Sequence, residues 1–256
     1  MMKNYRIMRK LAIIFIVAVL AFPLVSASVL EKPDWREGDY WEYRVGYGVE
    51  GAETAGGEIT TRILGTENVT IGNTTYHCIV AKEKVNASEK TVYYDEESLA
   101  VVKEISYDNE TEEKIYDPPF AFIQYPIFIG KKWNATVEWK NTSIILQLEC
   151  TGRENVSTRA GKFDCYVIKV NYAPNGTVNP DFYQIFYISG KAGNVVRTEG
   201  YANSTLVGYR ELLSFHYGVY SNKQPDYAMV IPFIAVGIFI LLLALLKSLY
   251  KFGAGK

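Results

Sequence analysis

The sequence has few of the residues on which catalytic and metal sites depend. Its 256 residues include two histidines and three cysteines, and no G-x-S-x-G, C-x-x-C or H-E-x-x-H motif occurs. Neither His77 nor His216 belongs to a spaced pair, whereas a zinc site needs three or four clustered ligands. We therefore expect no catalytic residues, no metal and no cofactor, and we interpret the chain as a protein other than an enzyme.

One glycine motif and two acidic runs also lack the context that a site requires. Gly46, Gly48 and Gly51 match G-x-G-x-x-G, but dinucleotide binding needs a helix directly after the glycines, and none is predicted there. The acids at 95–97 and 110–113 have no regular spacing for calcium ligands. We interpret the glycines as a loop between strands and the acids as solvated turns.

Both ends of the chain carry long apolar segments. Basic residues within 3–10 precede the apolar run 11–25, and Ser26-Ala27 offers a cleavage site, so residues 1–27 are predicted to be a signal peptide. Residues 227–247 include a run of 19 uncharged residues, enough to cross a bilayer as one helix. The lysines of the tail 248–256 place that tail in the cytoplasm. The sequence thus predicts a single-pass protein of the cell membrane, with residues 28–226 extracellular and the C-terminus cytoplasmic.

All 28 acidic residues lie between the two apolar segments, together with 20 of the 27 basic ones. The resulting formal charge of about −8 argues against a nucleic-acid partner. We expect the membrane as one partner and an envelope protein or a glycan as another, and the oligomeric state stays open.

The same middle segment contains every match to the N-glycosylation motif N-x-[S/T]. Because these motifs are confined to the part of the chain that topology places outside, we predict that the protein is a glycoprotein. A polar, Asn- and Thr-rich surface is the alternative. The predicted acceptors are Asn68, Asn73, Asn86, Asn109, Asn134, Asn141, Asn155, Asn175 and Asn203.

The middle segment also contains an internal repeat. Residues 65–82 align without a gap on residues 152–169, at an offset of 87. The match extends to Trp41 and Trp133, each three residues after a glycine, and it aligns Tyr94 with Tyr187. Two tandem repeats, 38–107 and 130–201, are therefore predicted.

Each repeat alternates between apolar and polar residues with the period of a β-strand. No sustained helical period occurs in the middle segment. We expect an all-β antiparallel meander of ten to twelve strands, forming either one curved sheet from both repeats or two stacked sheets as in a sandwich, followed by the one transmembrane α-helix.

Three cysteines in an oxidising compartment allow one disulfide. Cys150 and Cys165 flank one predicted hairpin, which makes them the favoured pair. Cys78 and Cys165 occupy equivalent repeat positions, which makes them the alternative.

The order of a signal peptide, a sequon-dense β domain, one span and a few lysines resembles archaeal surface glycoproteins. The G-x-x-W-x-x-x-V strand of each repeat is similar to strands of the curved-sheet lipoprotein carriers of the LolA/LolB type. We therefore expect a membrane-anchored cell-surface glycoprotein that acts as a binding or structural module of the envelope. The alternative is a carrier or sensor that holds an apolar or saccharide ligand in a curved β-sheet cleft, with Trp41, Tyr43, Trp133 and Trp139 as ligand-binding residues. For these aromatic residues, plain core packing is the competing interpretation.

Overall fold

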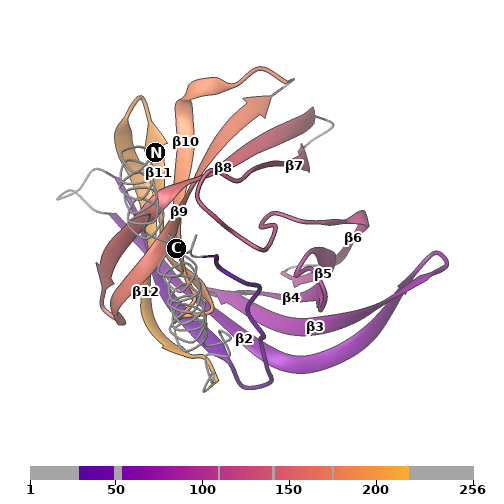
Figure 1. Ribbon diagram of the computed structural model, residues 1–256. Coiled ribbons are helices and arrows are strands. Elements are labelled where there is room, and N and C mark those ends of the chain that lie inside the picture. Colours follow the sequence, from indigo (N-terminus) through magenta and orange to yellow (C-terminus); the bar gives the residue numbers. More distant parts are fainter. Residues whose placement is uncertain (1–28, 49–53, 109, 140–141, 175, 219–256) are drawn as a thin grey trace, which may run out of the picture. The chain divides into compact units, whose positions relative to one another are not determined.

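The computed structural model describes residues 29–48, 54–108, 110–139, 142–174 and 176–218. They form one antiparallel sheet of twelve strands, strongly curved and nearly closed (Figure 1). This confirms the predicted all-β meander, as one curved sheet rather than two stacked ones. Within the described ranges, no helix is long and apolar enough to span a membrane. The predicted signal peptide and transmembrane helix lie outside these ranges.

The strands follow one another along the chain as a series of hairpins. Their bounds are β1 Tyr40–Tyr47, β2 Thr54–Ile71, β3 Thr74–Val85, β4 Ser88–Asp95, β5 Val101–Tyr107, β6 Thr111–Phe120, β7 Lys132–Trp139, β8 Thr142–Thr158, β9 Gly161–Pro174, β10 Asn179–Ser189, β11 Asn194–Ala202 and β12 Thr205–His216.

The two ends of this series meet in the middle of the sheet. The spatial order is β6-β5-β4-β3-β2-β1-β12-β11-β10-β9-β8-β7, so β1 pairs with β12 and the edges are β6 and β7. The segment that joins these edge strands, residues 121–131, is here called the link. Each half of the sheet therefore contains six strands, one more than the five that each predicted repeat spans.

Strand register repeats between the two halves, as the sequence match implies. Trp41 lies opposite Thr61, and Trp133 lies opposite Leu148, which is 87 residues after Thr61. Both long hairpins, β2–β3 and β8–β9, carry a bulge at the corresponding point, one before Gly65 and the other before Gly152. Because register decides which face a side chain occupies, equivalent residues of the two halves lie on equivalent faces.

The turn before each tryptophan is also the same. Gly38 and Gly130 have φ angles of 92° and 89°, in the region that favours glycine. The amide of Gly38 donates to the carbonyl of Ile63, and the amide of Gly130 donates to that of Cys150. These two acceptors are again 87 residues apart.

The register corrects one detail of the sequence alignment. Tyr187 lies opposite Val167 and Arg197, and the residue with the equivalent partners, Val80 and Lys103, is Tyr93. The predicted match of Tyr94 with Tyr187 is therefore wrong by one residue. The equivalent bulge after each tyrosine leaves their register equal. The error arises because 13 residues separate Val80 from Tyr93 whereas 20 separate Val167 from Tyr187, so no ungapped match crosses these hairpins.

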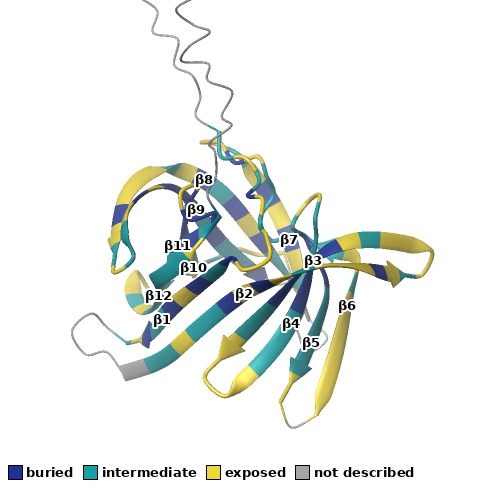
Figure 2. Cartoon of the chain, turned by 90° about the horizontal axis from the view of Figure 1, so that it is seen from below, coloured by how far each residue is buried: buried dark blue, intermediate teal, exposed yellow. Residues whose placement is uncertain are grey.

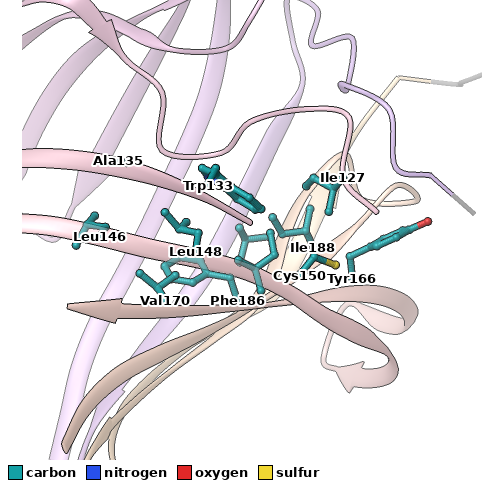
Figure 3. Close-up of a cluster of buried hydrophobic side chains, with 12 residues drawn as sticks. Ile127, Trp133, Ala135, Leu146, Leu148, Cys150, Tyr166, Val170, Phe186 and Ile188 are labelled. Carbon is teal, nitrogen blue, oxygen red and sulfur yellow. The ribbon is translucent and has the colours of Figure 1, made fainter. Parts of the chain in front are cut away.

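The sheet has apolar contacts on both faces. On the outer face, a buried cluster forms around Cys78, Val80, Tyr93 and Val102. The tip of the β2–β3 hairpin extends beyond the sheet and is exposed (Figure 2). A larger buried cluster lies on the opposite face (Figure 3) and consists of Ile127, Trp133, Ala135, Leu146, Leu148, Cys150, Tyr166, Ile168, Val170, Phe186, Ile188 and Val195.

Candidate ligand-binding face

The link identifies which face lies inside the curvature. Phe122 of the link contacts Phe186 of β10, with ring centroids 5.1 Å apart. It also contacts Phe120, which stacks on Tyr116 of β6 at 5.8 Å. Strands β6 and β10 are far apart in the sheet order, so a chain of rings can join them only across the inside of the curve. We call this face, which carries Phe186 and Tyr116, the inner face.

The inner face of the second half is apolar. Its buried cluster continues into the partly buried side chains of Val137, Ile144 and Tyr172. Phe182 lies two positions before Gln184, which is opposite Val170 of the cluster, so strand alternation places Phe182 on the same face. Its side chain is 51% exposed. These four residues and the cluster are here called the apolar half.

The inner face of the first half carries a network of paired charges beside buried apolar side chains such as Ala81 and Val92. The ammonium of Lys90 lies 3.1 Å from a carboxylate oxygen of Glu83 and 3.5 Å from one of Glu104. The hydroxyl of Tyr94 donates to Glu83 at 3.4 Å, and that of Tyr116 donates to Glu104 at 3.3 Å. We call the five residues of this network the charged half.

The pKa values of this network reflect its burial and its charges. Burial raises the pKa of Tyr94 well above its usual value, and Glu83 and Glu104 add to the rise. Burial and Glu104 together raise the pKa of Tyr116 to about 12. Burial lowers the pKa of Lys90, but the two carboxylates outweigh it, so this pKa is raised. All three groups therefore keep their protonated forms at neutral pH.

Comparison of equivalent positions shows how the two halves diverged. Register places Glu83 at the position of Val170, and Lys90 at that of Gln184. Glu104, opposite Val92, has its equivalent in Thr198, opposite Phe186. Each ionised member of the charged half thus has an uncharged counterpart.

Arg210 and Thr198 lie opposite each other on β12 and β11. The guanidinium carbon of Arg210 lies 4.6 Å from the centroid of the Tyr43 ring. The hydroxyl of Tyr43 donates to the carbonyl of Val195 at 2.9 Å. These three residues lie on the inner face, between the charged half and the apolar half.

Three of the aromatic residues predicted to bind ligand lie in the core. Trp41 is fully buried, and its indole nitrogen donates to the carbonyl of Ala192 at 2.7 Å. Trp133 is 8% exposed and donates to the carbonyl of Phe122, and Tyr43 is also buried. Trp139 ends β7, and its side chain lies outside the described part. The three described rings thus match the core-packing interpretation.

Two open surface pockets of the described residues lie elsewhere. One has a volume of about 450 Å³ and lies between the link and the segment before β1, with Ile123, Tyr125 and Glu31 among its lining residues. The other has a volume of about 350 Å³ and is bordered by Trp35, Arg36 and Gly65. Neither pocket is lined by a predicted ligand-binding residue.

All predicted glycosylation sites that the structure describes are accessible. Asn68, Asn73, Asn86, Asn134, Asn155 and Asn203 are exposed, whereas Asn109, Asn141 and Asn175 fall outside the described residues. Exposure is a requirement for modification but does not demonstrate it, so glycosylation stays a prediction.

The predicted disulfide between Cys150 and Cys165 is wrong. All three cysteines are free and buried. Cys165 lies opposite Glu154, four residues along β8 from Cys150, which separates the two along the strand by about 13 Å, far beyond disulfide reach. The alternative partner, Cys78 on β3, is six strands away from Cys165 on β9. Burial raises the pKa of Cys78 to about 11 and that of Cys165 to about 12, so both are unreactive thiols at neutral pH.

His77 is a surface residue that contacts Asn68 and Glu96. Among the described residues, no three His, Cys, Asp or Glu side chains are arranged to hold a metal ion.

Sequence reasoning missed Arg210, Thr198 and the charged half. A lysine or a glutamate in an alternating strand is normally assigned to the solvent side. The sequence did contain one signal, because alternate residues of a strand lie on the same face. Glu83 shares its face with the apolar residues Ala81 and Ile79, and Lys90 shares its face with Val92.

Comparison with known proteins gives matches of low similarity. A family model described as DUF3108-like matches residues 133–212, which run from β7 into β12 and thus cover the second half. The comparison with curated proteins gave no match.

Three solved structures match the chain with low similarity. A Parabacteroides distasonis protein provisionally described as a lipoprotein is 15% identical, with a TM-score of 0.39 over 73% of this chain and 99% of that one. A Bacteroides fragilis protein with a YmcC-like fold, provisionally described as exported, is 14% identical, with a TM-score of 0.41 over 74% and 100%. A β-barrel-like DUF1849 protein from Brucella abortus is 11% identical, with a TM-score of 0.38 over 72% and 100%. These values are too low to transfer a function, and the resemblance to archaeal surface glycoproteins stays a prediction.

Proposed function

We propose that the chain is a ligand-binding module of the cell envelope, whose inner face holds the apolar part of a ligand. The supporting observation is that the apolar half passes from a buried core into partly exposed side chains inside the curve of the sheet. Apolar side chains left partly open beside a buried core are candidates for contact with a ligand. A purely structural module gives no reason for this exposure on the inner side, so the carrier or sensor role is favoured. The proposal contains no catalytic step.

The proposed location is the outside of the cell, with one C-terminal helix in the membrane. The distribution of charge around both apolar segments supports it, and so does the exposure of the six described sequon asparagines. A protease added to intact cells is expected to remove residues 28–226 and spare the tail after Lys247. Digestion of the tail alone, detected by antibodies against each end, would reverse the proposed orientation.

Photolabelling of the full-length chain in lipid nanodiscs tests ligand binding. The probe is a neutral long-chain alkanol that carries a diazirine, and labelled peptides are identified by mass spectrometry. We expect label on peptides that contain Val137, Ile144 or Phe182, because these side chains form the accessible part of the apolar half.

Two matched substitutions control for surface adsorption. Ile144→Gln places an amide on the inner face and is expected to reduce labelling about fivefold to tenfold, since about 1 kcal/mol or more of apolar contact is lost. Ile115→Gln makes the same change at a residue that is 53% exposed. Ile115 lies opposite Lys103, on the outer face, so labelling should not change. Equal labelling of both variants, or label confined to the terminal apolar segments, would refute the proposed site.

A further inference from the structure

Arg210 has no carboxylate partner among the described residues, and the same is true of Arg62, an exposed residue of the outer face that contacts the ring of Tyr40. Arg44 pairs with Glu211, Arg153 with Asp164, and Arg197 with Glu199. For Arg210, the described residues offer a contact with the ring of Tyr43 but no hydrogen bond or ion pair. Its Nε is buried without a partner. An arginine has five N–H donors, so this inner-face guanidinium has unused capacity to bind an anion.

The first half of the sheet has an acidic residue at the position equivalent to Thr198. Arg210 lies opposite Thr198, and its structural equivalent, Lys114, lies opposite Glu104. At the position where the first half carries an acid beside its base, the second half carries a threonine. The hydroxyl oxygen of Thr198 is also buried without a hydrogen-bond partner. Two neighbouring polar groups of the inner face thus lack partners among the described residues.

The neighbours of this pair on the inner face are two glycines, the ring of Tyr47, which lies opposite Gly208, and a ring of the apolar half. Gly208 and Gly200 lie opposite each other two residues along β12 and β11, so they add no side chains to the inner face. On the other side of Thr198 lies Phe186 of the apolar half, its partner on β10. At a strand spacing of about 4.8 Å, Arg210 is roughly 10 Å from the start of the apolar half.

We propose that Arg210 and Thr198 bind the anionic group of an amphiphilic ligand whose alkyl chain lies along the apolar half. This inference rests on the proposed function and adds the chemical class of the ligand, a long-chain carboxylate or alkyl phosphate. The guanidinium donates to two oxygens of the anion. The hydroxyl of Thr198 donates to the third oxygen of a phosphate, or to one of the two oxygens of a carboxylate. The ring of Tyr43 supports the guanidinium from below by a cation–π contact.

The charged half limits where the anion can bind. Lys90 is already paired with Glu83 and Glu104, so it is not available as a competing anion site. The carboxylates of these two residues repel an anion on their side of the inner face. The head group is therefore directed to Arg210 rather than to Lys90, and the chain is directed away from the acids.

The test compares probes of equal chain length with the full-length chain in nanodiscs. A neutral diazirine alkanol, the corresponding fatty acid and the corresponding alkyl phosphate are titrated against photolabelling of the inner-face peptides. We expect at least one anionic probe to bind about tenfold more tightly than the alkanol, the size of one charge-assisted hydrogen-bonded pair. Arg210→Met should abolish that advantage without changing alkanol labelling. Thr198→Val should reduce it by a smaller factor, roughly threefold.

The outcomes separate this inference from the proposed function. Equal affinity for all three probes, or an anionic advantage that survives Arg210→Met, would overturn the anion site while alkanol labelling still supports an apolar site. Absence of inner-face labelling by every probe would refute both. Arg44→Met removes a paired arginine and should leave the preference intact. Acetate and inorganic phosphate are added as competitors: if they block labelling at the concentrations of the long-chain probes, the site binds free anions and the amphiphile assignment is wrong.

Discussion

Replacement of Trp41 by alanine is expected to lower the free energy of unfolding by about 3 to 5 kcal/mol, the usual loss for a buried tryptophan. The ring is fully buried and packs on Trp35 with centroids 5.4 Å apart. Domains of this kind have a total stability on the order of 5 to 15 kcal/mol, so the variant should be marginal. Urea denaturation of the full-length chain, followed by the β-sheet signal in circular dichroism, measures the difference.

Two further variants show which part of the tryptophan matters. Trp41→Phe keeps an aromatic ring but removes the donor to Ala192, and it should cost less, roughly 1 to 3 kcal/mol, for the unpaired carbonyl and lost volume. Phe182→Ala removes an inner-face ring that is half exposed and should change stability by less than about 1 kcal/mol. If Trp41→Ala unfolds within 0.5 kcal/mol of the parent, roughly the error of the extrapolation, the assignment of this ring to the core is wrong.

Replacement of Glu199 by leucine should be the second most damaging change. Glu199 is 8% exposed, and its carboxylate pairs with the guanidinium of Arg197 at 2.7 Å. It also accepts hydrogen bonds from Tyr187 at 3.2 Å and from Tyr201 at 2.8 Å. Loss of one partner of a buried ion pair costs about 3 to 5 kcal/mol. We expect the lower end, about 3 kcal/mol, because the Arg197 side chain is 35% exposed and can turn to water.

The tyrosines provide a second measurement of the same change. Burial and the hydrogen bond to Glu199 raise the pKa of Tyr201 to about 12. Removal of the carboxylate should therefore move this pKa toward its usual value near 10, as followed by absorbance of the phenolate. Glu199→Gln keeps an acceptor and should lose less stability than the leucine variant. If Glu199→Leu is as stable as the parent, the network contributes nothing and the tyrosine hydroxyls find water instead.

The equivalent position in the first half explains why leucine is an informative choice. Glu199 lies opposite Ile185, and register matches it to Ile105, opposite Thr91. Ile105 packs against the apolar cluster of the outer face. The fold thus accepts an aliphatic side chain at this position when no arginine depends on it for a partner.

The alternation of apolar and polar residues was enough to predict the sheet, because period two has one structural meaning in a half-buried strand. The ungapped match of 65–82 with 152–169 predicted a common register because both hairpins carry the same bulge. The extension of the match beyond these segments was wrong at Tyr94, because hairpins of different length leave no ungapped alignment there. The prediction of a disulfide between Cys150 and Cys165 was wrong because two residues of one hairpin need not lie opposite each other.

The inner face was harder to predict from sequence. Glu83, Lys90 and Glu104 have the composition of a solvated surface, and only pairing across strands places them inside the curve. Arg210 gives no local signal at all, since its unusual feature is a missing partner. That feature becomes visible only when Thr198 is compared with Glu104 of the other half.

The junction of β1 and β12 also separates the order of strands in space from their order along the chain. Every other pairing of the described sheet joins neighbours in the sequence, whereas Glu42 and Ser214 at this junction are 172 residues apart. Closing a loop of that length costs roughly 2 to 3 kcal/mol more conformational entropy than closing a ten-residue hairpin. A circularly permuted chain that begins at Lys132, joins His216 to Leu30 through a linker and ends at Phe120 would run through the strands in their spatial order. Such a chain could assemble its whole sheet from successive hairpins, so the native order makes folding depend on one late encounter between the two ends of the domain.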